Sequence, residues 1–272
     1  MNLKRWAMVA MGLALLLSGR VRAAEDQERI RLRFNYWVPS LNGRIKVTDK
    51  DILGSGVKLG VKLDLADDLK LGGPQYLSEP ELQFQITRRN NLILSYFSFD
   101  VRGSHTFSTD IPFNGVVFKA GSSFSTELKE SRLKIVWAFS PLMGDRGLLS
   151  LRIGLEQYWF NLEYSGHETT TGMHVHKSVN QPLPIPIIGL DGQLNIIDGL
   201  GFYGSADYMN LAYGNARAWM LDLEGGLRWK YRFVYLGVGY RSIQSYINSP
   251  DPNDILFNAQ QQGWLGTLGV QF

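Results

Sequence analysis

The stretch that decides the fold is residues 219–241, which read WMLDLEGGLRWKYRFVYLGVGYR. These residues alternate in chemical character along two runs that are joined by Lys230-Tyr231-Arg232. The apolar face of the first run holds Trp219, Leu221, Leu223, Leu227 and Trp229, and the opposite face carries Asp222, Glu224 and Arg228. The second run repeats the pattern, with Val234, Leu236, Val238 and Tyr240 opposed to Gly237, Gly239 and Arg241. Alternation with a period of two residues predicts a β-hairpin with two chemically different faces.

The two faces of this hairpin indicate its surroundings. Large aromatic residues lie at the ends of the apolar face, and full charges lie on the other face. This pattern is typical of a transmembrane β-barrel, in which outward side chains contact lipid and inward side chains line a polar lumen. Within hydrocarbon, a β-sheet must close on itself so that every backbone polar group is hydrogen-bonded. The sequence therefore predicts an all-β fold, a single antiparallel up-and-down barrel that spans a membrane.

The first residues predict a secretory leader rather than a part of the fold. Lys4 and Arg5 precede an apolar run, residues 7–17, which is too short to span a bilayer. Small residues up to Ala23 fit the site that a signal peptidase reads. We therefore expect residues 1–23 to be a signal peptide, with an uncleaved N-terminal anchor as the alternative.

Residues 24–272 are expected to form one domain, the barrel itself, although cleavage after Ala24 is an alternative start. Without the four basic residues of the leader, 24 Lys and Arg face 25 Asp and Glu, so this part is close to neutral. Nucleic acid is therefore not an expected partner. Cys is absent, which excludes a disulfide, a thiolate metal site and a lipid-anchored lipoprotein. No cofactor is expected.

Alternating segments recur along the chain and predict ten strands. They cover residues 30–38, 81–87, 92–101, 132–139, 149–156, 184–194, 200–208, 219–229, 234–241 and 262–272. Their connections alternate between long and short, as in barrels with short periplasmic turns and long external loops. The long loops are expected at 40–73, 103–125, 165–182 and 244–261. Eight or twelve strands are alternatives, because the first two of these loops can each add or remove strands.

Three segments depart from simple alternation. The apolar residues of 92–101 shift from Leu92, Leu94 and Tyr96 to Phe97, Phe99 and Val101, and this change of phase predicts a β-bulge. Residues 64–71, DLADDLKL, predict one or two helical turns. The strand at 184–194 contains two prolines, which disfavour a central strand. Its outward residues are expected to be Ile188, Leu190 and Leu194.

The inward face is expected to be a network of paired charges. The basic candidates are Arg31, Arg33, Arg102, Arg132, Lys134, Arg152, Arg228 and Arg241, and the acidic candidates are Glu81, Asp100, Glu156, Asp191, Asp207, Asp222 and Glu224. Buried charge is tolerated only when it is paired and hydrogen-bonded, so this near balance predicts a lumen filled with ion pairs. We expect Arg228→Ala to leave a carboxylate unpaired and to destabilise the fold by roughly 3 kcal/mol. A narrow or gated polar path is the alternative.

Aromatic residues at the ends of the outward rows predict the girdles of a membrane barrel. They are Tyr36, Trp137, Trp219, Trp229, Tyr240, Trp264 and Phe272. The final strand ends at Phe272 and has apolar residues at alternate positions before it. Here the chain resembles Gram-negative outer-membrane β-barrel proteins, whose last strand carries such a signal for the assembly machinery. The runs 36–43, 64–71 and 184–189 are similar to uncharacterised small outer-membrane protein families.

This resemblance implies a location in the outer membrane, contact with its lipid and lipopolysaccharide, and the barrel-assembly machinery as a partner through the strand that ends at Phe272. It brings no site residues. All four histidines fall in expected loops, and His167, Glu168, His174 and His176 are the only candidates for a metal site. One loop without further ligands is a weak signal, so no metal is expected.

Ser104, His105 and Asp110 place a nucleophile, a base and an acid near the expected rim. Their flanking residues match no hydrolase or acyltransferase motif, so we do not expect an enzyme, and a lipid-modifying enzyme is the least favoured hypothesis. The favoured hypothesis is a structural or interaction role through external loops, with a charge-filled narrow lumen. A narrow pore or passive transporter of small solutes is the alternative.

Overall fold

The computed structural model describes residues 29–272 except 49–60, 114–115, 145, 169–171 and 250–253. The expected signal peptide therefore lies outside the described residues. The described chain is all-β, and no helix within it is long and apolar enough to cross a membrane.

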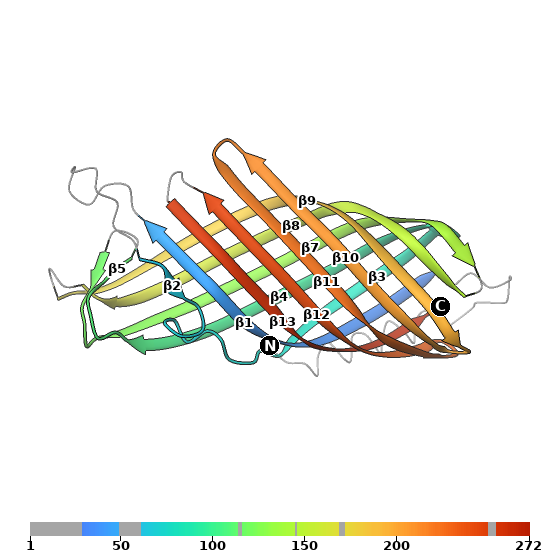
Figure 1. Ribbon diagram of the computed structural model, residues 1–272, viewed down its shortest axis with the longest axis horizontal. Helices are drawn as coiled ribbons and strands as arrows, with labels where there is room; N and C mark the ends of the chain where they lie inside the picture. Colours follow the sequence, from blue (N-terminus) through green and yellow to red (C-terminus); the bar gives the residue numbers. More distant parts are fainter. Residues whose placement is uncertain (1–28, 49–60, 114–115, 145, 169–171, 250–253) are drawn as a thin grey trace.

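Ten strands close into one antiparallel barrel, in which each strand pairs with the next along the chain (Figure 1). The last strand pairs with the first over residues 254–271 and 31–48, so the sheet has no free first or last strand. The ten strands are β1 (Ile30–Thr48), β3 (Leu77–Thr87), β4 (Asn90–Thr106), β7 (Ser123–Gly144), β8 (Gly147–His167), β9 (His174–Ile197), β10 (Leu200–Tyr213), β11 (Ala216–Tyr231), β12 (Val234–Ser249) and β13 (Asp254–Gln271). The predicted fold class and strand number are confirmed.

Three short strands are not part of the ten-stranded wall. β2 (Leu63–Asp64) pairs with β1, and β5 (Ile111–Phe113) pairs with β6 (Val116–Phe118) as a separate hairpin. We call the end of the barrel that holds Ile30 and Phe272 the terminal end, and the opposite end the loop end. At the terminal end the described connections are two-residue turns at 88–89, 198–199 and 232–233.

The strands are far longer than a membrane requires. A tilted strand of about 9–11 residues spans a bilayer, whereas β7, β8 and β9 contain 22, 21 and 24 residues. Figure 1 shows the loop ends of β7 and β8, in green and yellow, projecting at the left. Most of the loops predicted at 165–182 and 244–261 are therefore strand, and this part of the prediction is wrong, whereas β4 and β7 take in only the ends of the loop predicted at 103–125.

The loop prediction failed because the outward and inward faces of a strand exchange their chemical character along its length. On β7 the outward side chains of Leu133, Ile135 and Trp137 are apolar and exposed, as a lipid-facing row should be. Closer to the loop end, the same outward row continues with Glu127 and Lys129. The inward row changes in the opposite sense, from Lys134 and Arg132 to Leu128 and Phe124. We call the two parts the membrane half and the loop-end half.

The same inversion replaces the bulge that was predicted in β4. The register between β4 and β7 runs without interruption from Asn90 opposite Phe139 to Thr106 opposite Ser123. Phe97, Phe99 and Val101 therefore face inward and are buried. Their apolar character does not mark a change of phase, because the interior itself has become apolar at this level.

An apolar core fills the interior of the loop-end half. It combines inward side chains of the wall with four leucines from the connection between β1 and β3, namely Leu63, Leu65, Leu69 and Leu71. The segment around Leu69 lies inside the wall, since a Cβ atom at Gly103 would fall 1.9 Å from the Leu69 carbonyl oxygen. Residues 64–69 form a single hydrogen-bonded turn in place of the predicted helical turns. Asp64 begins it, accepting hydrogen bonds from the Ala66 and Asp67 amides at 2.9 and 3.0 Å.

The prolines of β9 lie where the wall is incompletely paired. β9 pairs with β8 from His174 to Leu194, but it pairs with β10 only from Ile187 onward. Pro182, Pro184 and Pro186 fall in the part that pairs with β8 alone. A strand edge without a partner tolerates proline, because no ladder hydrogen bond is lost there. The strand predicted at 184–194 is confirmed, and it begins ten residues earlier, at His174.

Candidate functional site

Inward charges of the membrane half meet in a layer that crosses the lumen, and Arg241 on β12 is one of its centres. Its Nε and Nη2 donate to the two carboxylate oxygens of Asp222 at 2.9 and 2.7 Å. Its Nη1 donates to Glu79 on β3, across the lumen. All three side chains are nearly fully buried, so Arg241 links β11 and β3 through the interior with little access for solvent.

Lys134 on β7 is the second centre of this layer. Its Nζ lies 3.2 Å from Asp207 Oδ2, 3.4 Å from Asp222 Oδ2 and 3.8 Å from Glu156 Oε2. Arg152 on β8 also approaches Asp207, at 3.3 Å. One ammonium group thus meets carboxylates from β8, β10 and β11, which is the arrangement that lets a buried charge persist.

Arg132 ends the layer on the side of the apolar core. Its Nε donates to Glu130 Oε1 at 2.7 Å and lies 3.8 Å from Glu156 Oε1. Its guanidinium carbon lies 5.0 Å from the ring centroid of Phe97 and 5.4 Å from that of Tyr158. The charged layer and the apolar core therefore meet at this side chain without a gap.

We call this group the charged layer. Its members are Glu79, Glu130, Arg132, Lys134, Arg152, Glu156, Asp207, Asp222 and Arg241. The structure brings seven of the predicted lumen residues together here, and it adds Glu79 and Glu130, which the sequence reading missed. Glu79 was missed because the second strand was expected to begin at Glu81. Glu130 lies two residues before Arg132 on the same face, so extending the alternation would have found it.

Arg33 forms a further cluster nearer the terminal end. Its Nη2 bonds Glu81 Oε2 at 2.6 Å, and its Nη1 lies 3.5 Å from Glu224 Oε1. Next to it, Asn35 donates to Glu79 at 3.4 Å and accepts from Thr267 at 3.0 Å. The predicted residues Arg33, Glu81 and Glu224 thus form an ion-paired cluster of their own, next to the charged layer.

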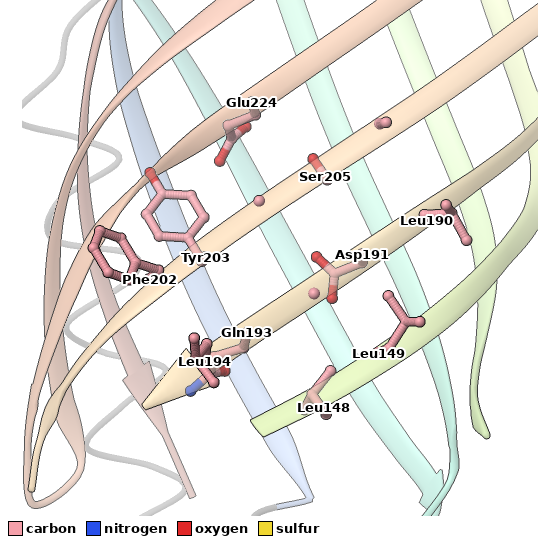
Figure 2. A pocket seen from close by; sticks show the side chains of 13 residues that line it. Leu148, Leu149, Leu190, Asp191, Gln193, Leu194, Phe202, Tyr203, Ser205 and Glu224 are labelled. Carbon is pink, nitrogen blue, oxygen red and sulfur yellow. The ribbon is translucent and has the colours of Figure 1, made fainter. Parts of the chain in front are cut away.

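A hollow of about 560 Å³ lies near the terminal end, along β8 to β11 (Figure 2), and it is lined both by inward residues and by the outward side chains of Leu149, Leu190, Leu194 and Phe202. Asp191, Ser205 and Glu224 form one row across β9, β10 and β11, and Tyr203 lies beside them. The wall is thin here, because Gly192 and Gly204 face each other in the lining. We call this space the terminal vestibule, which the charged layer separates from the apolar core.

Two predicted lumen residues, Arg31 and Arg228, lack carboxylate partners among the described residues. Arg31 Nη1 donates only to the Gln83 amide oxygen, at 3.4 Å, and Arg228 contacts the ring of Tyr235. The expectation that Arg228→Ala leaves a carboxylate unpaired is therefore wrong. Asp191, predicted inward, lines the vestibule and makes no ion pair with a described residue.

Arg102 and Asp100 were also predicted to face the lumen, and this is wrong. Both side chains are exposed on the outer wall of the loop-end half, at 71% and 50%. Arg102 bonds Glu127 at 2.7 Å, and Lys129 joins the cluster at 3.0 Å from Glu127 and 3.5 Å from Glu163. The hydrogen bond from Lys129 and the neighbouring Arg102 lower the pKa of the Glu127 carboxyl. The error follows from the predicted bulge, because a change of phase at Phe97 would have turned Asp100 and Arg102 to the inner face.

The predicted girdle aromatics all lie on the outward rows. Tyr36, Trp137, Trp229, Tyr240, Trp264 and Phe272 are exposed, and Trp219 is half-buried because it stacks on Tyr246. Trp264 also contacts Tyr240 edge to face, with ring centroids 5.7 Å apart. These side chains thus belong to the surface that contacts lipid.

The metal and catalytic candidates are not assembled. Ser104 and His105 point to opposite faces of β4, and His105 packs on Phe107. Asp110 accepts a hydrogen bond from the Ala120 amide at 2.8 Å. The rings of His167 and His174 lie 5.3 Å apart, but no group of three or more metal-ligating side chains gathers within the described ranges. Among these residues, no nucleophile and base are brought together.

No protein-family model matches the sequence, and no curated protein matches it significantly. Solved structures are similar in fold. The outer membrane protease OmpT of Escherichia coli superposes with a TM-score of 0.53 at 10% identity, covering 93% of this chain and 99% of that one. The transport unit of the autotransporter AIDA-I of E. coli gives 0.42 at 12% identity, covering 97% of each chain. The toluene transporter TodX of Pseudomonas putida gives 0.35 at 9% identity, covering 96% and 94%.

At these identities the likeness to OmpT establishes the fold alone. Together with the closed ten-stranded sheet and its apolar outward band, it defines the class of protein. The chain has the fold of an outer-membrane β-barrel protein.

Proposed function

We propose that this protein is a non-conducting barrel that serves a structural or interaction role through the outer surface of its loop-end half. The observation that carries the proposal is the charged layer, which links β3, β7, β8, β10, β11 and β12 across the lumen. Its side chains are at most 8% exposed, so water has little access to them. An ion crossing the lumen would have to break several buried pairs.

The apolar core supports the same proposal, because it forms a second barrier on the loop-end side. Leu65 and Leu69 of the β1–β3 connection are completely buried against the wall. A packed apolar plug excludes hydrated ions and small polar solutes. This arrangement favours a closed barrel over a passive transporter.

The surface available to a partner is the outer wall of the loop-end half. Ser104, Ser125, Ser165 and His176 form one row across β4, β7, β8 and β9. Arg102, Glu127 and Glu163 form the next row toward the membrane. This polar surface, which contains a hollow of about 460 Å³, suits contact with polar groups next to the membrane, lipopolysaccharide among them. No catalytic activity is part of this proposal.

The proposal also includes a role for the last strand in assembly. Trp264, Leu268, Val270 and Phe272 form its outward apolar row. We assign this row as the surface that the barrel-assembly machinery recognises, in keeping with the resemblance of the C-terminal strand to such signals.

Planar-bilayer recording of the refolded protein tests the closed lumen. We expect no stepwise conductance when the sample shows the fast-migrating band of a folded barrel on an unheated gel. A known porin added to the same bilayer should produce steps and so verify the membrane. Stepwise currents from the folded protein alone would reject the proposal in favour of a pore.

A further inference from the structure

Arg31 and Arg228 differ from the other inward arginines of the membrane half. Arg33, Arg132, Arg152 and Arg241 each contact at least one carboxylate. Neither Arg31 nor Arg228 makes an ion pair with a described residue, and the Nε of Arg31 is buried without a hydrogen-bond acceptor. A guanidinium group carries five N–H donors, so most of their capacity is unused.

The ring of Tyr235 brings these two guanidinium groups close together. The guanidinium carbon of Arg31 lies 5.7 Å from the ring centroid, and that of Arg228 lies 5.4 Å from it. Two like charges beside one ring repel each other, and this repulsion is strongest where water is scarce. An anion between the two groups would relieve it.

Tyr235 is fixed in place, so the pair of arginines is held in position. The tyrosine is buried, and its hydroxyl approaches the Leu32 carbonyl oxygen at 3.5 Å. Its ring lies over Gly269, where an added Cβ would come 2.1 Å from the ring. The ring therefore bridges from β12 across β13 to β1 and serves as a rigid support.

The pair makes no ion pair with a described residue, and the Asp191 carboxylate acts on both guanidinium groups only at longer range. Glu224 shares a face of β11 with Arg228, but its carboxylate already contacts Arg33. The charged layer closes the lumen on the other side, so the arginines are reached only from the terminal end.

We propose that Arg31 and Arg228 bind an oxyanion, a phosphate or carboxylate group, at the terminal end of the lumen. The planar fork of a guanidinium group matches the oxygen spacing of both anions and forms two parallel hydrogen bonds to either. Tyr235 orients both forks through cation–π contacts. The site binds a group presented from the side of the membrane on which the termini lie.

Calorimetric titration of the folded, detergent-solubilised protein tests this site with two probes, inorganic phosphate and acetate, in a buffer free of both. We expect saturable binding of at least one probe, and the comparison identifies the anion class. Arg228→Gln and Arg31→Gln should each weaken binding tenfold or more, because each removes a charge-assisted fork.

Arg232→Gln is the matched control, since Arg232 also stacks on a tyrosine, Tyr231, but lies in the β11–β12 turn. It should bind with unchanged affinity. If the two test variants fail to fold, the wild type alone tests the proposal. The bound probe should raise the temperature at which its folded gel band is lost. Absence of saturable heat in the wild type, or equal affinities of the Arg228→Gln and Arg232→Gln variants, overturns the proposal.

Discussion

The two halves of the barrel are built from the same strands with opposite polarity. In the membrane half, Ile153 and Leu155 of β8 point outward and Arg152 and Glu156 point inward. In the loop-end half of the same strand, Asn161 and Glu163 point outward while Phe160 and Leu162 are buried. The alternation is identical in both halves. A period of two residues therefore identifies a strand. It does not show whether the apolar or the polar residues of that strand face the interior, because this depends on whether lipid or water surrounds the barrel.

In each half, the polarity of the outer face matches the surrounding solvent. Lipid makes an apolar outer face favourable in the membrane half, so charges gather inside and must pair with one another. Beyond the membrane the strands meet water, and the sheet gains stability by burying apolar side chains as a soluble β-barrel does. The interior therefore changes from ionic to apolar at Arg132, which contacts both Glu130 and the Phe97 ring.

The largest effect is expected from breaking the charged layer. Arg241→Ala removes the partner of Asp222 and Glu79, which are buried in the lumen. Leaving such charges unpaired costs about 3–5 kcal/mol. The temperature at which the fast-migrating gel band disappears should therefore fall clearly. Arg217→Ala, on the exposed face of β11, should leave it unchanged, and equal transitions for both variants would contradict the layer.

The interior of the loop-end half is tested by two neighbouring residues of β4. Phe99 is buried and Asp100 is exposed. Phe99→Ala should reduce the free energy of unfolding by about 3 kcal/mol, the lower end of the cost of removing a buried phenyl ring. Asp100→Ala should change it by less than about 0.5 kcal/mol. Urea titrations followed by tryptophan fluorescence measure both. If Phe99→Ala leaves the free energy of unfolding unchanged, the predicted bulge would be supported and Phe99 would lie on the outer face.

The boundary between the halves is tested by the same substitution at two outward positions of β8. Ile153→Arg places a charge against lipid and should cost about 2–4 kcal/mol. Asn161→Arg, on the same outward row in the loop-end half, should cost less than about 0.5 kcal/mol. Unfolding in lipid vesicles compares the two variants. Similar losses at both positions would show that hydrocarbon extends over the loop-end half.

The fold could be predicted from the sequence because apolar outward residues alternate with polar inward residues throughout the membrane half. Ten strands, the outward rows and most inward charges follow from alternation, and Lys134, Asp207 and Asp222 do meet in the lumen. The loop-end half could not be read in this way. There Phe97 and Phe99 follow the lipid-facing pattern in composition while pointing to the interior, and no local signal distinguishes lipid from an apolar core.

The sequence also could not predict which inward charged residues form ion pairs with each other. Alternation predicts that Arg228 and Arg241 both face the lumen, yet only Arg241 contacts carboxylates. Which inward charges meet depends on the register and the width of the cylinder, because partners such as Arg241 and Glu79 lie 162 residues apart. The missed Glu79 and Glu130 show the same limit, since they fall just outside the expected strands.

The proline-bearing edge of β9 has a consequence for how copies of this protein behave toward one another. An unpaired strand edge offers a template on which a strand from another molecule can add, and this is a route to aggregation. Each proline in the row 182, 184, 186 lacks the N–H group that such an added strand would need. The prolines therefore disfavour the addition of a strand along positions 182–186 of this edge.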